Sequence, residues 1–195
     1  MLARRGVLPE TRSNEPMRCH VIALGLLLLV GLGSTPVLAQ SPDTLKRGSS
    51  DWALGASLGL PGYGAQTAPE LFTLGFQATQ LRPGRLGADF SIGTMPALLV
   101  EGVLPVGVRL GVALPVEVAP RFLLVPSAGF SGLGVLAIGN GGGGSVGLNA
   151  GVAAMVFGTG SLGLRAGVTC HQLLGTGGAL WLVELGFISK PKAVR

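Results

Sequence analysis

The chain has 195 residues, which is room for one domain, with a formal net charge of +5. Glycine accounts for 34 residues and charged residues for only 12%, about half the ~25% usual in a soluble domain. After residue 40 no apolar run approaches the ~18–20 residues of a membrane-spanning helix, because Gly, Pro or a polar residue always interrupts it. The composition therefore excludes an ordinary helical membrane protein, and the weak positive charge gives no case for nucleic-acid binding.

The first 39 residues have the pattern of a targeting segment. A short basic start follows Met17, residues 21–33 are almost wholly apolar, and small residues lead to Ala39. This order predicts a cleavable signal peptide, with cleavage between Ala39 and Gln40. Residues 1–16 are then an N-terminal extension, and either Met1 or Met17 is the true start. An uncleaved membrane anchor is the alternative. Residues 40–50 are polar and are expected to be a flexible lead-in to the folded part.

The remainder, residues 51–188, alternates apolar and small residues with a period of two. Such alternation, broken by Gly- and Pro-containing turns, is typical of β-strands joined as hairpins. The last hairpin shows it well: Leu164, Ala166 and Val168 share one face, whereas Arg165 and Gly167 share the other. Eight strands are predicted, followed by a C-terminal tail at residues 189–195. The predicted strands span residues 51–60, 70–81, 86–94, 106–116, 121–136, 145–157, 161–171 and 179–187.

The predicted connections alternate in length. The longer ones fall at residues 61–69, 95–105, 139–144 and 172–178, and the shorter ones at 82–85, 117–120 and 158–160. An up-and-down transmembrane barrel has this order, with short periplasmic turns and longer outside loops. Two of the longer connections need a separate prediction. The run at 139–144 (GNGGGG) is expected to be a flexible loop, and 95–105 is either a loop or an early start to the next strand, with Pro105 at a bulge or edge.

The second face of each strand decides the fold class. A soluble β-sandwich or lipocalin-like barrel would carry Lys, Glu, Asp and Arg on its solvent-exposed face. Here that face is mostly Gly, Ala, Ser, Thr and Asn, which suits the narrow lumen of an eight-stranded barrel. The branched and aromatic face is then free to meet lipid. An open sheet in hydrocarbon would leave backbone groups unpaired at several kcal/mol each, so the barrel must be closed. We expect an all-β, eight-stranded antiparallel up-and-down transmembrane β-barrel.

The few charges on the inward face balance one another. They are Asp89, Arg109, Arg165 and Glu184, two acids and two bases. Buried charges persist when they are paired, which predicts an ion network in the lumen. If the last turn centres near Leu174 and Gly175, Arg165 lies directly across from Glu184. A turn shifted by two residues would make the pair diagonal or separate it. The network is expected to hold the barrel together, and an ion path is the alternative.

The chain resembles the OmpA/OmpX-like class of small outer-membrane β-barrels of Gram-negative bacteria. The resemblance covers about residues 51–187 and rests on the leader, the period-two repeat, the loop order and the final Leu-Val-Glu-Leu-Gly-Phe, which is similar to a terminal barrel-assembly signal. Eight residues follow that signal here, and aromatic residues make up only 5%. The resemblance implies an outer-membrane monomer inserted by the barrel-assembly machinery. Trp52 and Trp181 are expected in one interfacial girdle.

Several functions remain open for such a barrel. A structural role in envelope integrity, with a plugged lumen and no open pore, is the leading prediction, and a surface-loop binding protein of the adhesin type is the alternative. Some related barrels modify lipids with His, Ser and an acid, but the His-x-Ser spacing is absent because Gln172 and Leu173 follow His171. The sequence shows no metal-ligand spacing and no phosphate loop. No enzymatic activity, cofactor or metal is expected. A lipid-modifying outer-membrane enzyme and a soluble periplasmic β-barrel are the remaining alternatives.

Overall fold

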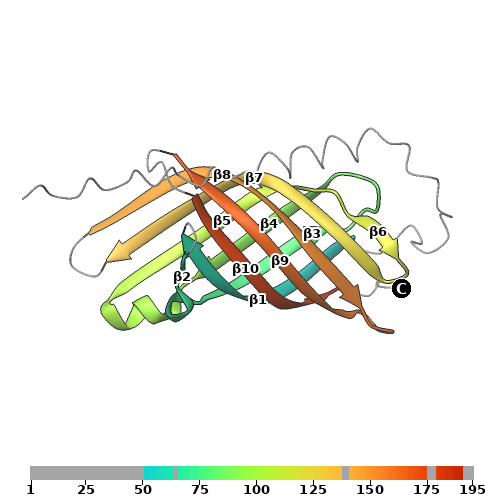
Figure 1. Ribbon diagram of the computed structural model, residues 1–195, viewed down its shortest axis with the longest axis horizontal. Helices are drawn as coiled ribbons and strands as arrows, with labels where there is room; N and C mark the ends of the chain where they lie inside the picture. The colour runs from blue at the N-terminus through green and yellow to red at the C-terminus, as the bar shows by residue number, and fades with distance from the viewer. Residues whose placement is uncertain (1–50, 64–65, 138–140, 175–178, 191–195) are drawn as a thin grey trace, which may run out of the picture.

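A computed structural model describes residues 51–63, 66–137, 141–174 and 179–190. Within these ranges the chain is an antiparallel β-barrel in which eight long strands run up and down at a tilt (Figure 1). Two short strands, β2 (Gln66–Thr67) and β6 (Val116–Ala119), extend the hairpins at its two ends. The predicted fold class is confirmed. The barrel strands are β1 (Trp52–Tyr63), β3 (Thr73–Gln80), β4 (Gly87–Thr94), β5 (Val103–Ala113), β7 (Phe122–Ala137), β8 (Gly141–Phe157), β9 (Leu162–Leu173) and β10 (Ala179–Ser189).

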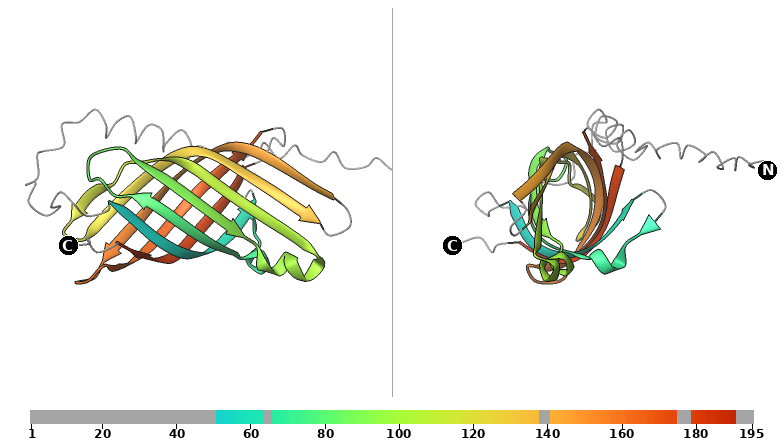
Figure 2. Two further views of the ribbon diagram at one scale, coloured as in Figure 1. Left: turned by 180° about the vertical axis from the view of Figure 1, so that it is seen from behind. Right: turned by 90° about the vertical axis from the view of Figure 1, so that its left-hand side faces the viewer.

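The first and last strands close the barrel. β10 pairs with β1 along its whole length, with Leu58 opposite Leu185, which is the closure that the sequence predicts. Following paired residues around the barrel from Ala53 returns to β1 at Tyr63, ten residues further along. Such a stagger requires strands that are strongly tilted against the barrel axis. The end-on view in Figure 2 shows the resulting closed ring.

The strands bury one face and expose the other, as the period of two predicts. In β1 the residues from Ala53 to Gly59 alternate between buried and exposed, with Gly55 and Ser57 inside and Leu54 and Leu58 outside. Among the described barrel strands, only four positions carry Asp, Glu, Lys or Arg, and all four are buried inside. They are the predicted residues Asp89, Arg109, Arg165 and Glu184.

The outer face is an uninterrupted apolar belt. Every barrel strand contributes large apolar side chains to it, including Leu58, Phe76, Ile92, Leu110, Phe130, Leu148, Leu164 and Leu185, all of them exposed. Soluble monomers rarely expose a contiguous apolar patch of more than a few hundred Å². A belt around the whole circumference, free of charge, is the surface expected of a barrel that faces lipid.

The turns at the two ends differ partly from the sequence prediction. The short-turn end comprises the connections at residues 81–86, 114–121 and 158–161, and the loop end comprises those that follow β1, β4, β7 and β9. The expected turn at 117–120 is mostly the strand β6, and the chain reverses at Arg121, whose φ is +68°. At the loop end, part of the predicted loop 61–69 belongs to β1 and β2.

The glycine-rich run at 139–144 is not the loop that the sequence predicts. Gly141–Gly144 form the start of β8 and pair with Gly134–Ala137 of β7, while residues 138–140 lie outside the described part. The connection is therefore shorter than predicted. The uncertain stretch 95–105 divides in two. Pro96–Glu101 form a 3-10 helix, η3, and β5 begins at Val103 with Pro105 inside the strand, opposite Val135.

The helical content is small. Besides η3, the described residues form one more 3-10 helix, η2 (Pro69–Leu71), at the same end of the barrel. Across the described ranges, no helix has the length and apolar character needed to cross a membrane.

Close backbone approach fixes glycine on the inner wall. Gly111 of β5 and Gly129 of β7 face each other, and a Cβ placed on Gly111 would collide with the backbone carbonyl oxygen of Ala128. On the same strand, a Cβ on Gly107 would meet only the carbonyl oxygen of Gly93, at 3.9 Å. The two glycines thus differ in the space around them although both lie inside the barrel.

We expect Gly111→Val to lower the free energy of unfolding by about 1–3 kcal/mol, the usual cost of overpacking a fitted interior. Gly107→Val, the matched control, is expected to change it by less than about 1 kcal/mol, because its side chain enters open space. Urea unfolding in lipid vesicles measures both. Equal effects of the two substitutions would contradict the assigned wall geometry.

Candidate functional site

The centre of the lumen holds a continuous ion network. Arg109 reaches from β5 to both sides: its Nε lies 3.4 Å from Asp89 Oδ2, and its Nη1 lies 3.7 Å from Glu184 Oε2 on β10. Arg165 Nη1 donates a hydrogen bond to the same Glu184 oxygen at 3.0 Å. The structure therefore brings all four predicted network residues together, and each of them is at most 5% exposed.

Two threonine hydroxyls complete the network. Thr79 on β3 donates to Asp89 Oδ1 at 2.7 Å, and Thr169 on β9 accepts a hydrogen bond from Arg109 Nη1 at 2.8 Å. Period-two sequence reading places both threonines inside, but nothing in the sequence shows that they contact charged residues. With them, the network ties together strands β3, β4, β5, β9 and β10, which lie on opposite sides of the ring.

The pairing of Arg165 with Glu184 is diagonal, not directly across. Glu184 faces Gly167, and Arg165 faces Gly186. The register is thus offset by two residues from the one expected for a turn centred near Leu174 and Gly175. The long arginine side chain spans this diagonal, so the ion pair forms despite the two-residue offset in register.

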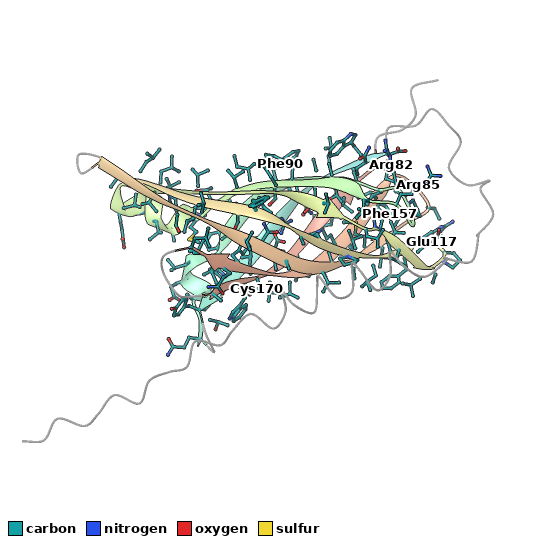
Figure 3. The ribbon with its side chains drawn as sticks, turned by 90° about the horizontal axis from the view of Figure 1, so that it is seen from above. Arg82, Arg85, Phe90, Glu117, Phe157 and Cys170 are labelled. Carbon is teal, nitrogen blue, oxygen red and sulfur yellow. The ribbon has the colours of Figure 1, made fainter. Side chains whose placement is uncertain are left out.

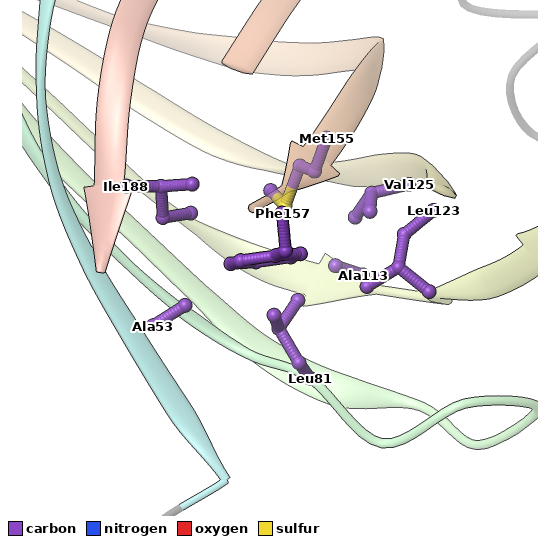
Figure 4. Packing of buried hydrophobic residues seen from close by; sticks show 8 residues of the cluster. All are labelled: Ala53, Leu81, Ala113, Leu123, Val125, Met155, Phe157 and Ile188. Atoms are coloured by element: carbon purple, nitrogen blue, oxygen red, sulfur yellow. The ribbon is translucent and has the colours of Figure 1, made fainter. Parts of the chain in front are cut away.

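Below the network, the short-turn end of the lumen is filled by an apolar plug. Eight buried residues from six strands or their ends meet there (Figure 4). Met155 and Phe157 of β8 occupy its centre in Figure 4, and the others surround them. The sequence pattern predicts an inward face of mostly small residues with four charged ones, and it does not predict this cluster of large apolar side chains. The plug consists of Ala53, Leu81, Ala113, Leu123, Val125, Met155, Phe157 and Ile188.

Charged residues surround this end of the barrel. Figure 3 shows Arg82, Arg85 and Glu117 at the same end of the barrel as Phe157. Just after β10, the Lys190 ammonium lies 4.4 Å from the centre of the Phe157 ring, a cation–π contact. Partial burial lowers the pKa of Lys190 below its ordinary value, and the negative charge of Glu117 offsets part of that effect. The cationic end of Lys190 thus covers the apolar plug.

Above the network, the loop end of the lumen is a blind pocket. This loop-end pocket has a volume of about 100 Å³ and is partly open to the outside. Arg109, Glu184 and His171 contribute to its lining, together with Ser131. The rest of the wall is predominantly apolar and includes the large side chains of Leu133, Leu173, Leu180 and Leu182. Of these, the sequence pattern assigns only Leu182 to the inward face, together with Glu184.

The remaining predicted residues do not belong to this interior. Trp52 lies at the short-turn end, opposite Gln80, whereas Trp181 lies toward the loop end, opposite Gly62. They therefore cannot form one girdle, because the length of β1 separates them. The cleavage site at Ala39 and Gln40 lies outside the described residues. Among the described residues no cluster of His, Cys, Asp and Glu could hold a metal ion.

Comparison with known structures bears on the fold. No family model matches the sequence, and no curated protein matches it. Neisserial surface protein A is similar over 74% of this chain and 99% of its own, with a TM-score of 0.54 and 13% identity. The N-terminal β-barrel domain of Pseudomonas aeruginosa OprF is similar over 72% of this chain and 98% of its own, with a TM-score of 0.51 and 13% identity. The chain has the fold of the small eight-stranded outer-membrane β-barrels.

Proposed function

We propose that this protein is a structural barrel of the outer membrane, exported by a cleaved signal peptide, that supports envelope integrity and conducts no ions through its lumen. The observation that carries the proposal is the filled interior. The ion network crosses the lumen at its centre, and the apolar plug fills it toward the short-turn end. Two successive barriers of different chemistry stand in the way of any solute.

The surface of the barrel supports the location. The charge-free apolar belt on the outer face suits hydrocarbon, and the charged residues of the short-turn end suit a water interface. The direction of the barrel follows from the connections, with the short turns in the periplasm and the loop end outside. The proposal assigns no catalytic step, since His171 lies beside Arg109 and Glu184 in the loop-end pocket without the His-x-Ser spacing of the lipid-modifying barrels. Insertion through the barrel-assembly machinery as a monomer is part of the proposal.

Planar-bilayer recording tests the closed lumen. We expect purified, refolded protein to give no steady conductance above that of the protein-free bilayer, because eight strands leave room only for side chains and these are packed. A refolded porin of more strands, inserted in the same way, is the positive control. A stable, large conductance from the eight-stranded protein would overturn the proposed plug.

A further inference from the structure

The loop-end pocket combines features that neither the fold nor the proposed structural role requires. It has a polar floor and apolar walls, and it is partly open at the end of the barrel where the longer connections lie. If the interior served packing alone, side chains would be expected to fill this space, as the apolar plug fills the opposite end of this barrel. The lumen is therefore packed with side chains at its short-turn end and partly open at its loop end.

The floor contains hydrogen-bond donors that have no partner in the described part of the protein. Within the described part of the chain, the Arg109 Nη2 and Ser131 Oγ atoms are buried and make no hydrogen bond. Both residues line the pocket, and they are only 3% and 7% exposed. Buried polar groups normally have hydrogen-bond partners, and the free-energy cost of leaving a donor without one is regained when a ligand supplies an acceptor.

The charge of the floor restricts that acceptor. The network beneath the pocket contains two arginines and two carboxylates, so its formal charge is already balanced. A ligand carboxylate would add an unbalanced negative charge to a buried site, which is costly. A neutral oxygen, such as that of a ketone or ester carbonyl, would accept from Arg109 and Ser131 without this penalty.

The walls and the volume of the pocket restrict the chemistry and size of the rest of the ligand, beyond its acceptor oxygen. Leu133, Leu173, Leu180 and Leu182 offer apolar contact from several strands. A closed cavity of about 150 Å³ accommodates a molecule the size of benzene. The pocket measures about 100 Å³ and is partly open, so it suits a slender chain of which about four heavy atoms are enclosed while the rest extends through the opening.

We propose that the loop-end pocket binds a slender aliphatic molecule that carries a neutral carbonyl oxygen at its inner end, placed against Arg109 and Ser131. The aliphatic part lies along the leucine walls and points toward the outside. This binding goes beyond the structural role, and because the pocket is blind it does not depend on conduction.

The structure supplies a matched pair of variants for the test. Gly107 lines the pocket and has open space at its Cβ position, so Gly107→Leu would fill the pocket. Gly134, opposite Val106 on the neighbouring strand, is not among the lining residues, its position alternates with the inward-facing Leu133, and a Cβ there would meet only the carbonyl oxygen of Val106, at 3.9 Å. Gly134→Leu therefore adds the same side chain on the outer face of the barrel. Ser131→Ala removes one donor and changes the shape very little.

The experiment titrates 2-hexanone into the protein in lipid nanodiscs by calorimetry, with empty nanodiscs subtracted to remove partitioning into lipid. Folding of each variant is checked by its migration on an unheated gel. We expect saturable binding of one molecule per barrel with a Kd of about 1 mM or tighter, given the few heavy atoms in contact. Hexanoate is expected to bind at least about tenfold more weakly because of its charge.

Gly107→Leu is expected to weaken binding at least about tenfold, since its side chain occupies the site. Gly134→Leu is expected to leave the Kd unchanged, and Ser131→Ala to raise it about 3–10-fold through the lost donor. No saturable uptake beyond that of empty nanodiscs, or hexanoate binding as tightly as the ketone, would overturn the proposal. If Gly107→Leu does not fold, an unchanged Kd in Ser131→Ala is the result that contradicts it.

Discussion

Replacement of Arg109 by Met is expected to lower the free energy of unfolding by about 3–5 kcal/mol, the usual cost of removing one partner from a buried ion network. Arg109 contacts Asp89, Glu184 and Thr169 and is almost fully buried. Without it, the remaining partner among the described residues is the Thr79 hydroxyl for Asp89 and the Arg165 guanidinium for Glu184. Urea titration of the protein in lipid vesicles, followed by tryptophan fluorescence, measures the loss.

The matched control is Arg82→Met. Arg82 forms an ion pair with Asp51 at 2.8 Å, shorter than either ion pair of Arg109, but the two side chains are 48% and 32% exposed. Exposed pairs contribute about 0–1 kcal/mol because water and salt screen them. We therefore expect a loss below about 1 kcal/mol for this variant. If Arg109→Met cost no more than Arg82→Met, the ion network would not be a stabilising element of the lumen.

Replacement of Leu110 by Arg tests the outer face. Leu110 follows Arg109 on β5, points outward between Phe90 and Phe130, and is 56% exposed. A charge at the midplane on the lipid face of a barrel costs about 2–4 kcal/mol, because it must leave water for hydrocarbon. We expect a loss of that size in the free energy of unfolding in vesicles.

Leu86→Arg provides the comparison. Leu86 has a similar exposed fraction, 59%, but lies in the connection at the short-turn end, where the chain meets water. The same substitution is expected to cost no more than about 1 kcal/mol there. Equal effects at the two sites, or a milder effect at Leu110, would mean that the apolar belt does not face lipid.

The period-two pattern predicts much of the fold because it reports directly on side-chain direction. It assigns eight strands, the closing pair of β1 and β10, and the inward direction of Asp89, Arg109, Arg165 and Glu184. It fails at Gly141–Gly144, because a run of glycine has no side-chain alternation, although its backbone pairs with β7 as well as any other. Glycine-rich sequence is therefore a poor indicator of a loop in this barrel.

The register between strands and the depth of each residue along the barrel axis are harder to predict from the sequence. A small shift of the last turn made the Arg165–Glu184 pair diagonal, and the turn residues themselves do not specify that shift. The sequence pattern also does not predict the apolar plug at one end of the lumen or the leucine-lined pocket at the other. Leu180 and Phe157 point inward near the strand ends, and only the three-dimensional structure shows which inward positions lie at which depth.

The central claim is that the charge-free face of a closed barrel lies in the outer membrane. Membrane fractionation combined with gel migration before and after heating tests it most directly. The account predicts that the protein is recovered with the outer membrane and that the unheated band migrates differently from the heated one, because a closed barrel remains folded in detergent until it is boiled. Recovery in the soluble periplasmic fraction, with a single band unaffected by heating, would contradict it.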